Sequence, residues 1–124
     1  MPEHKAESRA TDLKAISLAE EAQRHSPNDA PLRSFLGYYY AEVGTAGKSL
    51  PLLRQAVVLA PDDPQVLYRV AEGYEVLHRR HEALQWISRA FTHGLAAETV
   101  LRNPELAALA ADQGLREAAT GKVR

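Results

Sequence analysis

Small and apolar side chains recur along most of the chain at steps of three and four residues, which is the spacing of one face of an α-helix. The predicted helices cover residues 11–25, 30–43, 48–59, 64–77 and 81–93. Asp29 and Asp63 are suited to cap the second and fourth of these, because a short carboxylate accepts hydrogen bonds from first-turn N–H groups. Gly94 is suited to end the last one. The pattern therefore predicts an all-helical chain.

The same pattern returns after 34 residues. The residues Leu36, Gly37, Tyr40, Ser49, Leu53 and Ala56 align with Val70, Ala71, Tyr74, Ala83, Ile87 and Ala90. Small residues at Gly37 and Ala83 would let the two helices of a hairpin approach closely, and a bulky substituent there should cost about 1–3 kcal/mol. The chain is thus expected to contain two equivalent helical hairpins, over 30–63 and 64–97.

Leu36-Gly37, Tyr40, Leu53 and Pro61 follow the pattern W-x-x-L-G-x-x-Y…A-x-x-x-F…P, so the chain resembles the tetratricopeptide repeat family. Arg33 stands at the tryptophan position and Leu95 where proline is expected. The resemblance implies a right-handed superhelical stack of antiparallel helical hairpins, an α-solenoid.

A single domain is expected over residues 1–124, with a frayed N-terminus at 1–10 and one unpaired helix, a half-repeat, at 11–26. Residues 98–124 would form a C-terminal cap and tail. Its apolar residues Val100, Leu101, Leu106 and Leu109 should cover the open side of the 81–93 helix, near Trp86 and Phe91. The cap resembles the closing segment of tetratricopeptide regions in bacterial eukaryotic-like serine/threonine kinases, although the chain carries no kinase motif.

Composition and charge narrow the possible partners. Of 124 residues, 45% are hydrophobic and 25% charged, and 15 basic against 16 acidic residues give a net charge of −1. No overall field would draw the chain to nucleic acid or to an anionic membrane. No run approaches the roughly 20 apolar residues of a membrane helix. We expect no nucleic-acid or membrane partner and, by default, a cytoplasmic location.

The sequence gives little evidence for a catalytic or a metal site. His78 and His81 enclose two arginines, whose charge opposes a bound cation. The pairs Asp62-Asp63 and Glu20-Glu21 are better explained as a capping linker and a solvated helix face. We therefore predict no enzyme activity, no metal and no cofactor. The basic stretch 78–81, together with tyrosines able to stack on bases, gives only a weak argument for nucleic-acid binding.

In tetratricopeptide proteins the first helices of successive hairpins line a concave groove, and the matching positions are the candidate site. They are Ser34, Phe35, Tyr38, Glu42, Gln65, Tyr68, Arg69, Glu72 and Glu75. Phe35, Tyr38 and Tyr68 are not needed for the repeat core, and aromatic residues are enriched at binding hot spots. The prediction is a non-catalytic protein–protein interaction module, an adaptor or scaffold, that holds a peptide or protein segment in the groove.

Two alternatives stay open. Phe35 and Tyr38 could simply pack on the N-terminal helix. The chain could also be a structural or self-association module that docks through that unpaired helix, either on a second copy or as the tail of a larger regulatory protein. A monomer or weak homodimer is expected.

Overall fold

The computed structural model describes residues 2–112 and residue 115, and all regular structure in this part of the chain is helical. The elements are α1 (Pro2–His25), α2 (Ala30–Glu42), α3 (Ala46–Leu59), α4 (Pro64–Val76), α5 (Arg80–Thr92), α6 (Ala97–Leu101), the 3-10 helix η1 (Pro104–Leu106) and α7 (Ala107–Ala110). The predicted all-α class is confirmed for these residues. No helix among them is both long and apolar enough to cross a membrane.

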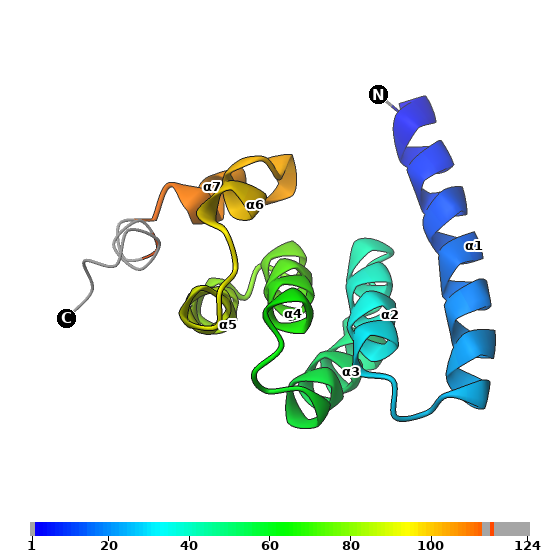
Figure 1. The fold of residues 1–124 in the computed structure, drawn as a ribbon. Coiled ribbons are helices and arrows are strands. Elements are labelled where there is room, and N and C mark those ends of the chain that lie inside the picture. The colour runs from blue at the N-terminus through cyan, green and yellow to red at the C-terminus, as the bar shows by residue number, and fades with distance from the viewer. Residues whose placement is uncertain (1, 113–114, 116–124) are drawn as a thin grey trace.

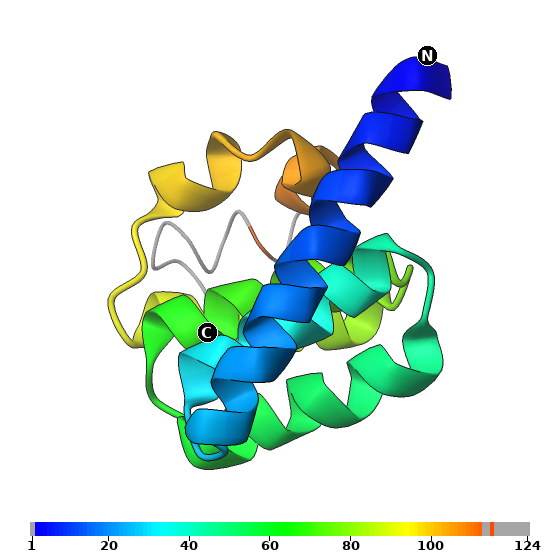
Figure 2. The ribbon, with the colours of Figure 1, turned by 90° about the vertical axis from the view of Figure 1, so that its right-hand side faces the viewer.

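The five long helices pack in pairs along the chain and through a further contact between α2 and α4 (Figure 1). Helix α2 packs on α3 and α4 on α5, while α2 and α4 pack on each other and α1 packs on α2. The short elements α6, η1 and α7 lie to one side of α4 and α5. The N-terminal part of α1 projects toward the same side (Figures 1 and 2).

Two of the predicted helix caps are present. The Asp29 carboxylate accepts a hydrogen bond from the Leu32 amide at 3.0 Å. The Asp63 carboxylate accepts from the amides of Gln65 at 2.9 Å and Val66 at 3.3 Å. Each cap leads into a helix with proline in its first turn, where a missing N–H group goes unused. The starts of α2 and α4 are therefore fixed by local sequence.

Helix α1 begins at Pro2, so the expectation of a frayed segment at 1–10 is wrong for residues 2–10. The stretch is rich in Ala, Glu, Lys and Arg, which favour helix even without an apolar face. The Arg9 guanidinium also donates a hydrogen bond to the Val43 carbonyl, at 3.0 Å, just beyond the last residue of α2. Further along, Ile16 and Ala19 are buried with residues of α2.

The six aligned residue pairs of the two hairpins are all buried. Leu53 packs between two glycines: a Cβ atom built on Gly37 would lie 2.6 Å from Leu53 Cδ2, and one on Gly73 would lie 2.9 Å from the same atom. Gly37 therefore has the close-packing role that its position predicts. Gly73 shares this role, although it falls outside the aligned pattern.

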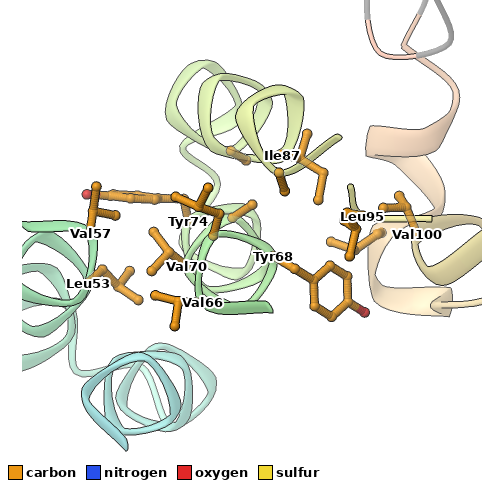
Figure 3. Close-up of a cluster of buried hydrophobic side chains, with 14 of the residues drawn as sticks. Leu53, Val57, Val66, Tyr68, Val70, Tyr74, Ile87, Leu95 and Val100 are labelled. Atoms are coloured by element: carbon orange, nitrogen blue, oxygen red, sulfur yellow. The ribbon is translucent and has the colours of Figure 1, made fainter. Parts of the chain in front are cut away.

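The main core continues from α3, α4 and α5 into the C-terminal segment. Val100, Leu106 and Leu109 are buried in the same cluster as Tyr68 of α4, and Trp86 and Phe91 pack against that cluster. Figure 3 shows Tyr68 extending toward Leu95 and Val100.

The expected position of this cap needs two corrections. Leu101 is 67% exposed and does not join the core. The segment also contacts α4 through η1, in addition to its contact with α5 through α7. Residues 113–114 and 116–124 of the predicted tail lie outside the described residues.

Candidate binding surface

Six of the nine predicted site residues come together, and we call them the α2–α4 face. They are Phe35, Tyr38 and Glu42 of α2 with Tyr68, Arg69 and Glu72 of α4. The two helices pack on each other, and residues one helical turn apart share a side. These predicted residues of the two helices therefore lie side by side.

Arg69 lies at the centre of the α2–α4 face. Its guanidinium carbon is 4.6 Å from the ring centroid of Phe35, 5.4 Å from that of Tyr38 and 5.5 Å from that of Tyr68. It also forms an ion pair with Glu72. A cation over aromatic rings is attracted by their negative faces, so these aromatic residues already hold a positive charge supplied by the chain itself.

The other three predicted residues do not join this cluster in the way expected. Ser34 is buried, and its hydroxyl donates to the Pro31 carbonyl at 2.6 Å, so it is not available to a partner. Glu75 forms an ion pair with Arg80 at the start of α5. Gln65 is exposed in the first turn of α4, before Tyr68 and Arg69.

Tyr68 and Glu72 were expected to be exposed, and this is wrong: they are 7% and 3% exposed. The C-terminal segment covers them. The Asn103 side-chain amide donates to the Tyr68 hydroxyl and to the Glu72 carboxylate, both at 2.7 Å. Its carbonyl oxygen accepts from the Glu105 amide at 3.0 Å and so caps η1. The predicted groove is therefore not open along α4.

Tyr38 joins α2 to the same segment. Its hydroxyl oxygen lies 2.5 Å from a Glu42 carboxylate oxygen and 2.6 Å from one of Glu105. Burial, followed by these two hydrogen bonds, raises the pKa of Tyr38 above its ordinary value. Partial burial and the neighbouring carboxylates, Glu42 first, raise the pKa of Glu105 to about 8. Asn103 and Glu105 are site residues that the repeat pattern did not reveal.

Charge at the α2–α4 face is mainly negative. Glu42 and Glu72 both lie near Glu105, and the Arg69 guanidinium pairs with Glu72. Asp12 of α1 lies near the edge, where burial and then the Glu42 charge raise its pKa. Phe35, Tyr38, Glu42 and Arg69 remain partly exposed. Tyr39 joins them, since its ring centroid is 6.2 Å from that of Phe35 and 5.5 Å from that of Tyr38.

A hollow lies between α1 and α3, with a volume of about 420 Å³. Tyr40 lines it and donates a hydrogen bond to Glu20, and Lys48 lies 5.5 Å from the Tyr40 ring centroid. Burial and the Glu20 bond raise the pKa of Tyr40 to about 12. The Tyr40–Glu20 bond holds α1 on α2, and the Lys48 contact joins α3 to the same ring.

Among the described residues, no group of three His, Cys, Asp or Glu side chains is placed to hold a metal ion. Of the two histidines weighed as ligands, His78 lies in the α4–α5 turn and His81 is exposed on α5. Comparison of the chain with protein-family models, curated proteins and solved structures finds no match. Arguments about function therefore depend on the arrangement of the side chains described above.

Proposed function

We propose that the chain is a tetratricopeptide-like helical repeat domain that acts as a non-catalytic protein-interaction module. Its partner would be a peptide or protein segment that contacts the exposed part of the α2–α4 face. In this proposal the chain acts as an adaptor or scaffold. The side chains that contact the partner are mainly those of Phe35, Tyr38 and Tyr39.

Equivalence between the two hairpins supports the repeat assignment. Their caps, Asp29 and Asp63, are 34 positions apart, and so are Gly44 and His78, which both take a positive φ angle after the first helix. The aligned core positions are buried in both hairpins. Such agreement at cap, turn and core is expected of a structural repeat whose units stack on each other.

The single observation that favours binding is the aromatic cluster of α2. Phe35, Tyr38 and Tyr39 are only partly buried and their rings are in contact. The Arg69 guanidinium lies over Phe35 and Tyr38, and the Tyr38 hydroxyl contacts the carboxylates of Glu42 and Glu105. Aromatic residues surrounded by polar groups of both signs are the usual composition of a binding hot spot. The exposed area is short, so we expect a dissociation constant on the order of micromolar, about −8 kcal/mol.

Peptides selected against the full chain from a random display library test this proposal. Binding of a selected peptide, measured by calorimetry, should weaken about tenfold or more in Phe35→Ala, because a hot-spot aromatic contributes at least about 1.4 kcal/mol. Val58→Ala is the matched control, since Val58 is 80% exposed on α3, away from this face. Equal affinities for the parent and a folded Phe35→Ala protein would contradict the proposal.

Self-association through α1 is the second candidate function. Leu18 is 65% exposed on this helix, while Ile16 and Ala19 face α2. A second copy could cover the exposed side of α1. If this function is correct, the molecular mass measured by light scattering should rise with protein concentration. A constant monomer mass would exclude it.

A further inference from the structure

Tyr38 makes two short contacts, with Glu42 and with Glu105, and two hydrogen bonds need two protons. If both carboxyl groups are ionised, the Tyr38 hydroxyl supplies only one. The Tyr38 oxygen lies within 2.6 Å of an oxygen of each of them. A phenol has a single O–H donor, and an ionised carboxylate can only accept. Tyr38 can therefore bond one carboxylate, and the other must itself carry a proton to donate. The geometry therefore requires one bound proton at this contact in addition to that of the Tyr38 hydroxyl.

The surroundings make this proton hard to replace by a cation. Facing the pair are Asp12 of α1, and Tyr68, Arg69 and Glu72 of α4. The charge of Arg69 is already engaged by Glu72 and by the aromatic rings. Helix α6 carries the exposed ion pair Glu98–Arg102. Ionising both Glu42 and Glu105 would thus place two like charges beside a third, Glu72, with one cation nearby.

We propose that Tyr38, Glu42 and Glu105 form a proton-dependent clasp, which holds residues 103–106 against α2 and α4 when protonated and releases them when the proton is lost. Release would uncover Tyr68 and Glu72, the part of the α2–α4 face that Asn103 now covers. The regulatory role of the clasp, control of partner access, rests on the proposed function. The existence of the clasp is independent of that function, because it can be measured on the chain alone.

The direction of the pH dependence follows from the Glu105 carboxyl. Its pKa is about 8 in the closed arrangement, against an ordinary value of 4.5. Between these two values the closed form holds a proton that the open form lacks, so the opening constant rises with pH. The rise is at most tenfold per pH unit and ends above about pH 8. Tyr38 and Tyr68 stay protonated over this range, because their pKa values are also raised.

NMR of the full chain tests the clasp by two measurements. Carbon-13 shifts of the side-chain carboxyl groups should show Glu105 titrating near pH 8. The hydrogen-exchange protection factor of the Leu106 amide, which bonds the Asn103 carbonyl at 3.0 Å, should fall between pH 5 and 8. A Glu105 midpoint near 4.5, or constant protection across this range, would overturn the proposal.

Two variants and one control make the test specific. In Glu105→Gln the amide can donate to the Tyr38 oxygen while Tyr38 donates to Glu42, without a bound proton, so the fall in Leu106 protection should disappear. Glu42→Gln should act in the same way if the first variant does not fold. Glu98→Gln, in the same segment but on α6 and paired with Arg102, should keep the parent's pH dependence. Unchanged pH dependence in a folded Glu105→Gln or Glu42→Gln protein would refute the clasp.

Discussion

Gly44 and His78 stand at the same place in the two hairpins and both have left-handed backbone, with φ angles of 81° and 62°. Glycine takes this conformation without cost, whereas a residue with a Cβ atom is strained by about 1–2 kcal/mol. A Cβ atom on Gly44 would meet no other atom within 4 Å. The effect of a substitution at Gly44 on stability should therefore reflect only the energy of the backbone conformation.

We predict opposite effects at these two positions. His78→Gly should stabilise the fold by about 0.5–1 kcal/mol, because part of the relieved strain is offset by the greater freedom of an unfolded glycine. Gly44→Ala should destabilise it by about 1–2 kcal/mol. Urea unfolding of both proteins measures the two changes. A shift of the same sign in both would show that the turns are not equivalent.

Single residues also show which features of the structure could be predicted from the sequence. Asp29 and Asp63 could be predicted as caps because a cap acts within three residues. The burial of Tyr68 and Glu72 could not be predicted, because Asn103 lies more than 30 positions away and outside the repeat register. Ser34 is buried and its hydroxyl bonds the Pro31 carbonyl one turn earlier, a local contact that the groove assignment did not consider.

At the scale of elements, prediction was accurate inside the repeats and poorer at the two ends. Helices α2 to α5 begin and end within two residues of the expected positions. Helix α1 is longer than expected, since helix propensity and the Arg9 contact act where no apolar pattern does. The C-terminal segment follows no repeat, so its apolar residues predicted a cap on the 81–93 helix but not its contact with α4.

Two leucines of the C-terminal segment provide a matched test of that cap. Leu106→Ala should lower the free energy of unfolding by about 2–5 kcal/mol, because the side chain is fully buried. Leu101→Ala, at an exposed position, should change it by less than about 0.5 kcal/mol. Urea unfolding measures both values. Similar small changes in the two proteins would mean that the segment does not pack on the repeats.

For the whole molecule, the two hairpins form a scaffold that brings the first helices, α2 and α4, side by side. The chain then uses its own C-terminal segment to cover part of the surface they form. The remaining exposed part carries the aromatic cluster of α2, and the clasp at Glu105 lies at its border. Binding and its control are thus proposed for adjoining parts of one face.

The central claim is that residues 103–106 lie on the α2–α4 face in solution. Nuclear Overhauser contacts in the isotope-labelled chain at pH 6, where the clasp is expected to be closed, test this most directly. We predict cross-peaks from the Asn103 side-chain amide to the Tyr68 ring, and from the Glu105 side chain to the Tyr38 ring. If both sets are absent while contacts between α2 and α4 are present, the hairpins form as described but the segment does not cover them, and the account is contradicted.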